Sequence, residues 1–106
     1  MATNDLYGCL VPTLEESKSL LEKILDITFE ARDSLYHGEY YHYGNNAEEH
    51  FLLKNNVDPF DGEPAEINFA DYPILLYVNR TTRSSELRNL FDRALGKFPL
   101  LRQKDA

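Results

Sequence analysis

The longest apolar run in the chain, residues 72–79 (YPILLYVN), places the strongest constraint on the fold. Successive side chains of a strand point to opposite faces, and both faces of this strand would be apolar. One face would carry Ile74, Leu76 and Val78, and the other Leu75 and Tyr77. A strand with one wet face would alternate apolar with polar residues, so the run predicts a central strand covered on both sides. Pro73 and the short length of the run argue against a buried helix.

A short strand and a long helix are expected upstream of this run. The strand spans residues 5–11, and Pro12 ends it. Thr13 and Glu16 then form the T-x-x-E pattern of a capping box, in which the threonine hydroxyl accepts a hydrogen bond from the glutamate amide. Apolar residues follow at spacings of three and four, which predicts an amphipathic helix over about residues 14–32.

The middle of the chain is expected to form two antiparallel strands followed by a loop. Residues 35–43 are rich in strand-favouring aromatics, residues 44–46 (GNN) are typical of a turn, and residues 49–57 largely alternate apolar with polar. Residues 58–71 contain two prolines and a glycine and have no clear periodicity. A loop of this length is usually functional or disordered.

A second helix is expected after the central strand, with Ser84 or Ser85 as its N-cap. Its apolar residues repeat at i, i+3, i+4, i+7, i+8 and i+11, namely Leu87, Leu90, Phe91, Ala94, Leu95 and Phe98. Gly96 fits a C-terminal cap, and Pro99 prevents the helix from continuing. Residues 99–101 are expected to form an edge strand or to pack back on the body, and residues 102–106 to fray.

Together these elements predict an α+β fold in one domain over residues 1–106. The expected order is β-α-β-β-β-α. The architecture is a single-domain sandwich in which two helices cover one face of a mainly antiparallel sheet.

The charge balance limits the possible partners. With 18 acidic and 11 basic residues the chain carries a formal charge of −7. Nucleic acid and anionic membrane surfaces are therefore excluded as expected partners, because lysine and arginine supply the affinity for both. A partner attracted by this field would be a basic protein.

Cysteine usage and the N-terminal sequence favour a cytoplasmic location. Cys9 is the only cysteine, so no disulfide can form within the chain. Residues 1–5 (MATND) lack the basic and apolar regions of a secretory signal, and no apolar run is long enough to cross a bilayer.

No catalytic, metal or cofactor site is expected. His37 and His42 are separated by an odd number of residues, so on one strand they would point to opposite faces and not converge with His50 on a metal. Residues 58–63 lack the ligand spacing of a calcium loop. Cys9 lies in an apolar strand, where a cysteine is usually an inert core residue. No phosphate loop, nucleophile elbow or zinc-protease motif occurs, so the chain is not expected to be an enzyme.

Two features predict a surface for binding a protein partner. Residues 58–71 carry five acidic and no basic residues, and the preceding strand is dense in tyrosine, a residue enriched at interfaces. The predicted partner-binding residues are Asp58, Asp61, Glu63, Glu66, Asp71, Tyr40, Tyr41 and Tyr43. The competing interpretation is that the acidic loop is merely solvated and that alternate tyrosines point into the core.

Three segments resemble the immunity proteins of bacterial contact-dependent growth inhibition and related toxin systems. They are residues 41–46 (YHYGNN), 49–54 (EHFLLK) and 71–78 (DYPILLYV). The resemblance implies a stoichiometric inhibitor of a cognate toxin domain, often a nuclease with a basic active-site cleft. It assigns no role to any single residue.

The leading hypothesis is therefore an immunity protein that neutralises a basic toxin, with a nuclease favoured, as a monomer or weak dimer. An alternative is a non-catalytic adaptor or small subunit of a larger bacterial complex, which would associate through a sheet edge or the tyrosine strand. A third is a metal- or ligand-binding domain that uses the histidines and tyrosines of residues 36–50.

Overall fold

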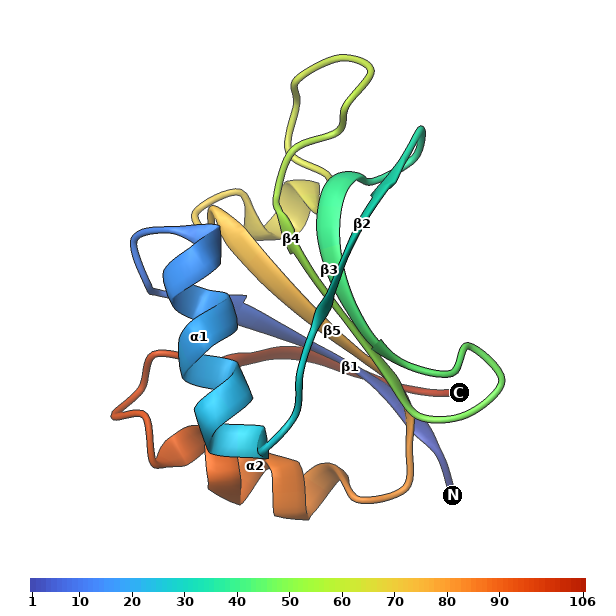
Figure 1. The fold of residues 1–106 in the computed structure, drawn as a ribbon, viewed down its shortest axis with the longest axis vertical. Helices are drawn as coiled ribbons and strands as arrows, with labels where there is room; N and C mark the ends of the chain where they lie inside the picture. Colours follow the sequence, from blue (N-terminus) through green and yellow to red (C-terminus); the bar gives the residue numbers. More distant parts are fainter.

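The computed structural model describes residues 1–106 as one antiparallel sheet with two helices on one face (Figure 1). The six strands lie in the order β2-β3-β4-β5-β1-β6, and every neighbouring pair is antiparallel. The elements along the chain are β1 (Thr3–Cys9), α1 (Leu14–Leu25), β2 (Glu30–Ser34), β3 (Gly38–Gly44), β4 (His50–Asn55), the 3-10 helix η1 (Ile67–Phe69), β5 (Ile74–Thr81), α2 (Ser84–Asp92) and β6 (Leu100–Asp105). The predicted α+β class, with helices on one face of an antiparallel sheet, is confirmed.

The core lies between the helices and one face of the sheet. Leu21 of α1 and Leu87 and Phe91 of α2 are fully buried against the strands. Tyr7 meets Phe91 edge to face, with the ring centroids 4.5 Å apart. Neither helix is long and apolar enough to pass through a membrane.

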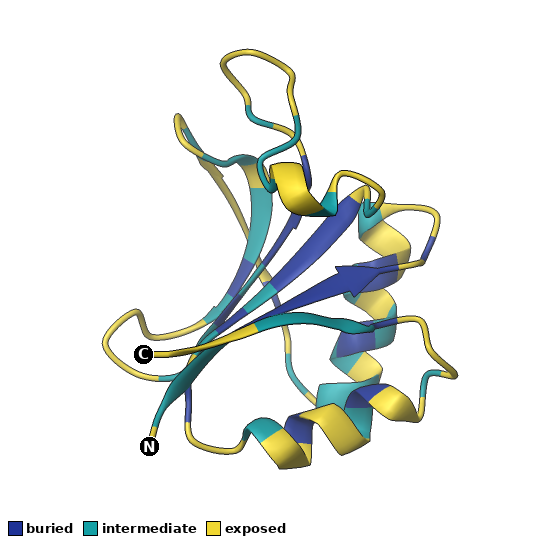
Figure 2. Ribbon diagram, turned by 180° about the vertical axis from the view of Figure 1, so that it is seen from behind, coloured by how far each residue is buried: buried dark blue, intermediate teal, exposed yellow.

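β5 is one of the two innermost strands, as predicted, and its first half is covered on both faces (Figure 2). Ile74, Leu76 and Val78 point into the core beneath the helices. On the opposite face Leu75 is completely buried, whereas Tyr77 is only partly covered.

The cover over Leu75 comes from the segment that joins β4 to β5. Asn56 holds this segment on the sheet: its amide donates to the carbonyls of Phe69 and Tyr72, at 3.0 Å each, and its side-chain oxygen accepts from the amide of Glu66 at 2.8 Å. The Tyr72 ring lies over Gly8, which pairs with Leu75 across the β1–β5 ladder. The rest of this second face carries no helix, and we call it the open face.

The structure shortens the first helix. α1 ends at Leu25, not near residue 32, because Asp26 adopts a left-handed conformation (φ 54°) and its amide donates to the carbonyl of Glu22. The Glu22 carboxylate also accepts from the amide of Phe29 at 2.8 Å. The apolar spacing continues past the helix because Ile27 and Phe29 of the connector also pack against the core, and so the prediction missed β2, which starts at Glu30. The Thr13 cap is confirmed by a 3.1 Å bond from the Glu16 amide.

The C-terminal prediction also needs correction. Residues 100–105 do not fray but form β6, which pairs with β1 along the sheet edge. Neither serine caps α2. Arg83 occupies the N-cap position, and the Ser84 hydroxyl donates at 2.6 Å to Asp5, a buried carboxylate of β1. A contact between residues this far apart in the chain leaves no local pattern in the sequence.

Gly8→Ala is expected to destabilise the fold by about 2 kcal/mol, as overpacking typically does. A Cβ atom at this position would lie 2.3 Å from the Cδ1 atom of Tyr72. Urea unfolding measures the loss. In a Tyr72→Ala background the same change should cost much less, and an equal cost in both backgrounds would show that the ring is not responsible.

Candidate functional site

Two loops meet at one end of the molecule, at the top of Figure 1. One is the β2–β3 turn around residues 35–37, and the other is the acidic segment that follows β4. A Cβ atom on Gly38 would lie 3.8 Å from Cβ of Pro59, so the two loops are in contact range. The predicted loop, which follows β4, therefore sits beside the hairpin formed by the two preceding strands of the sheet, β2 and β3.

The acidic loop is internally ordered by its own carboxylates. Asp58 accepts a hydrogen bond from the amide of Phe60 at 2.8 Å, and Asp61 accepts one from the amide of Glu63 at 2.9 Å. The amide of Asp58 also donates to the carbonyl of Glu63 at 2.7 Å. These Asx-type bonds fix the loop backbone and leave the second oxygen of each aspartate free.

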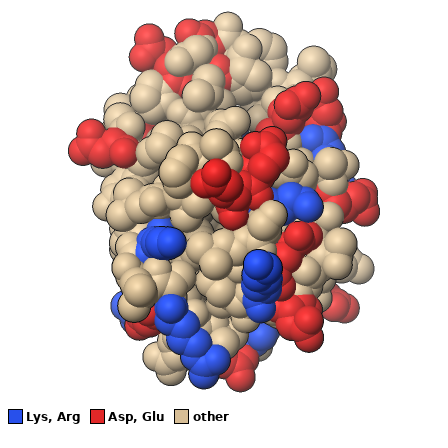
Figure 3. Space-filling view, turned by 60° about the vertical axis from the view of Figure 1, so that its left-hand side comes forward, with Lys and Arg blue, Asp and Glu red and all other residues tan.

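The structure separates the predicted acidic residues into two groups. Glu66 forms a 2.8 Å salt bridge with Arg102 of β6 and is thereby neutralised. Asp58, Asp61, Glu63 and Asp71 form no salt bridge. On the face drawn in Figure 3, Asp and Glu side chains reach the upper end, and most of the Lys and Arg lie lower.

The same end exposes large apolar side chains. Leu35 and Tyr36 in the β2–β3 turn are each 78% exposed, and Phe60 in the acidic loop is 74% exposed. Val57, at the base of the loop, is 47% exposed. Large apolar groups gathered and left in water at one end of a small domain indicate an interaction surface.

We call this surface the acidic tip. It consists of the turn residues Leu35 and Tyr36, the loop residues Val57, Asp58, Phe60, Asp61 and Glu63, and the flanking acids Asp33 and Glu39, which pair with each other across the β2–β3 ladder.

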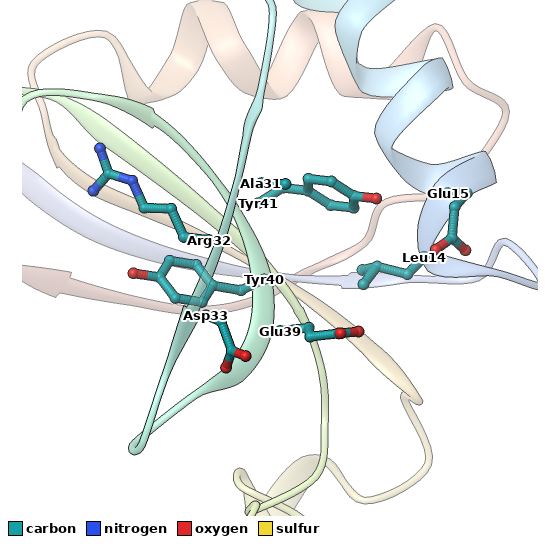
Figure 4. Close-up of a pocket in the computed structure, with 8 residues that line it drawn as sticks. All are labelled: Leu14, Glu15, Ala31, Arg32, Asp33, Glu39, Tyr40 and Tyr41. Atoms are coloured by element: carbon teal, nitrogen blue, oxygen red, sulfur yellow. The ribbon is translucent and has the colours of Figure 1, made fainter.

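A cleft of about 420 Å³ continues the negative surface from the tip toward the start of α1 (Figure 4). Glu15, Asp33 and Glu39 line it, and none of the three forms a salt bridge. The Tyr41 ring points across the cleft toward α1 in Figure 4.

The predicted tyrosines do not form one surface. Tyr41 and Tyr43 lie on the helix side of β3 and pack against the core, with Tyr43 5.5 Å from Phe51 between ring centroids. Tyr40 points to the open face. The alternation that sends neighbouring side chains to opposite faces separates them.

The prediction that His37 and His42 point to opposite faces of the sheet is wrong. β3 begins only at Gly38, so His37 belongs to the preceding turn and the odd spacing does not apply to it. His37, His42 and His50 all line one groove on the open face, and the rings of His42 and His50 are 6.0 Å apart between centroids. No three side chains of histidine, cysteine, aspartate or glutamate lie close enough together to hold a metal ion.

Cys9 is separated from every histidine by the sheet itself. The thiol lies on the helix side and is completely buried, and burial raises its pKa to about 12. It therefore stays protonated at neutral pH and is unsuited to nucleophilic attack.

Sequence reasoning missed the apolar part of the tip. The strand-favouring pattern of residues 35–43 places Leu35 and Tyr36 in a strand, whereas the structure leaves both exposed in a turn, and Phe60 of the loop is exposed as well. Their position next to turn residues was the available signal, because an apolar residue in a tight turn has little core to reach.

The comparisons with known proteins identify no relative: no protein-family model matches the chain, and no curated protein matches it. The function of the protein is therefore inferred from the geometry of the site.

Lys54 is an unusual feature of the open face. Lys54 is only 4% exposed. Its ammonium group contacts Nδ1 of His37 at 3.3 Å, and no carboxylate lies within salt-bridge range of it. Burial lowers the pKa of Lys54, although the more distant Asp58 and Glu66 partly offset this effect. The pKa of His37 is also lowered, by burial and by the charge of Lys54.

Lys54→Met is expected to stabilise the protein by roughly 1 kcal/mol at pH 7, because it removes a buried and unpaired charge. The folded-state pKa of Lys54 lies below its ordinary value of 10.5. The loss of stability caused by burying the charged ammonium is therefore complete at pH values below the folded-state pKa, and it disappears as the pH rises toward 10.5. The advantage of the variant in urea unfolding should shrink between pH 7 and pH 10.

The control is Lys104→Met, which changes an exposed lysine on β6 and should have little effect at either pH. If Lys54→Met is less stable than the parent at pH 7, the contact with His37 outweighs the cost of burial and the prediction is wrong.

Proposed function

We propose that the protein is a cytoplasmic immunity protein that binds a cognate basic toxin domain through the acidic tip and neutralises it without performing chemistry. The observation that carries this proposal is the combination of unpaired carboxylates with exposed apolar side chains at one end of the molecule. The resemblance of three segments to such proteins agrees with it.

The composition of the tip suits a protein interface. Specific interfaces combine a desolvated apolar or aromatic centre with a polar rim. Here Leu35, Tyr36 and Phe60 supply the centre, and Asp58, Asp61 and Glu63 supply the rim. Burying the apolar groups would provide affinity, and the carboxylates would steer a basic partner into contact.

A nuclease is the favoured target because its active-site cleft must attract phosphate groups. A cleft that binds phosphates is lined by lysine and arginine. The unpaired carboxylates of the tip and of the cleft beside Tyr41 present negative charge, as the phosphate groups of nucleic acid do. An inhibitor that occupies such a cleft would compete with nucleic acid.

The adaptor alternative receives less support from the structure. An association through a sheet edge needs an open, uncharged edge strand. Both edge strands carry charged side chains instead, Glu30, Arg32 and Asp33 on β2 and Arg102, Lys104 and Asp105 on β6. These charged side chains protect both edges of the sheet from pairing with another strand.

The first test is charge removal at the tip. The triple variant Asp58→Asn, Asp61→Asn and Glu63→Gln should slow association with the toxin domain encoded by the adjacent reading frame by at least tenfold at low salt. Stopped-flow or surface plasmon resonance measurements over a range of salt concentrations should also show a weaker salt dependence for the variant.

The matched control removes the same charge elsewhere. Glu48, Asp92 and Asp105 are exposed and form no salt bridge, so their amides should leave association nearly unchanged. Equal slowing in both triple variants would mean that only net charge matters. No binding to the toxin domain by the parent protein would overturn the proposal.

The second test addresses the apolar centre. Phe60→Ala should accelerate dissociation of the complex by at least tenfold, as expected for an interface hot spot of about 2 kcal/mol. The melting temperature should not change, because the Phe60 side chain is exposed in the free protein. Leu95→Ala, at a 91% exposed residue after α2, is the control. An unchanged dissociation rate for Phe60→Ala would remove Phe60 from the interface.

A further inference from the structure

The open face of the sheet carries a groove that the proposed inhibitor function does not use. One part has a volume of about 380 Å³ and lies over β3, β4 and β5. A second part of about 160 Å³ lies over β1, β5 and β6. Tyr77 and Asn79 line both parts, so the two border each other on the open face.

We propose that this groove binds a small organic anion, a carboxylate or phosphate carried on a planar ring. The inference does not depend on the proposed function, because no residue of the acidic tip lines the groove; Arg32 and Tyr40 line both the groove and the neighbouring cleft.

The larger part of the groove is richer in basic side chains than the protein as a whole. The chain has a formal charge of −7, yet the larger part of the groove is lined by Arg32 and the histidines at 37, 42 and 50, with no carboxylate. The smaller part is lined by Lys104, by Arg102, which is paired with Glu66, and by the buried Asp5. Among the strand side chains that point to the open face, Glu30 is the only acid.

Free donors are available in the groove for an anion. Arg32 bonds Glu30 through Nε at 3.0 Å and also lies beside the Tyr40 hydroxyl, and its Nη groups still have further N–H donors to offer. His37 accepts from Lys54 through Nδ1, so its proton lies on Nε2, which has no other partner. The buried Lys54 ammonium also lacks a carboxylate in salt-bridge range, and an anion bound nearby would offset its charge.

The floor of the groove suits a flat ring. Leu52 and Tyr77 face each other across the β4–β5 ladder and supply apolar surface. The imidazoles beside them are held in place: His42 bonds Asn46 at 3.0 Å, and His50 bonds the carbonyl of Glu48 at 2.8 Å and the amide of Asn79 at 3.3 Å. A volume of this size matches the lower end of small-molecule pockets, and fixed polar groups around an apolar floor are typical of them.

The test uses two pairs of probes that differ only in the anionic group. AMP is compared with adenosine, and benzoate with benzamide, by amide chemical-shift titration of the full-length protein. At least one anionic probe should give saturable shifts at Leu52, Tyr77 and Asn79, and its neutral counterpart should bind at least tenfold more weakly. The pair that responds shows whether the groove prefers a phosphate or a carboxylate.

A pair of variants locates the site. Arg32→Gln should weaken binding of the responding anion by fivefold or more, because it removes the guanidinium group and its free N–H donors. Arg93→Gln removes the same charge from an exposed residue after α2 and should leave the affinity unchanged. The proposal is overturned if neither anion gives saturable shifts, if the neutral probes bind equally well, or if both variants weaken binding alike.

Discussion

The structure depends on the burial of β5 on both faces. Because Ile74, Leu76 and Val78 must leave water on one side and Leu75 on the other, the fold needs a cover on each face of the sheet. The two helices supply the first cover. The second is small and made of irregular chain, which Asn56 and Tyr72 hold over the start of the strand.

This unequal cover determines where function can reside. Beneath the helices the sheet face is a packed core, as the fully buried Cys9 illustrates. The chain that covers the start of β5 extends beyond the sheet and brings Phe60 and its neighbouring carboxylates to the acidic tip. The uncovered remainder of the open face leaves a polar groove in the middle of the sheet.

The charge distribution follows the same division. Acidic residues without partners gather on the loops and the hairpin at the tip, where they remain solvated. Arginine, lysine and histidine gather on the open face, where Glu30 and Glu66 pair with the two arginines and the buried Lys54 has no carboxylate partner. Like charges that lie close together repel each other. Acidic side chains gathered at the tip and basic side chains gathered on the open face are therefore consistent with two surfaces shaped for binding.

The sequence by itself determined the features that depend on neighbouring residues. The apolar run of β5, the Thr13 cap and the acidic loop are local patterns that are present in the structure, as is the first part of the second helical pattern, which ends with α2 at Asp92 and leaves Leu95 exposed. Only the tertiary structure decided which residues meet across the chain. The position of Gly38 at the start of β3 brought His37 to the same face as His42 and His50, and the packing of the sheet decided that the Tyr41 face of β3 meets the core. The pairing of β6 with β1 and the bond from Ser84 to Asp5 join residues far apart in sequence, and such contacts depend on the packing of the whole chain.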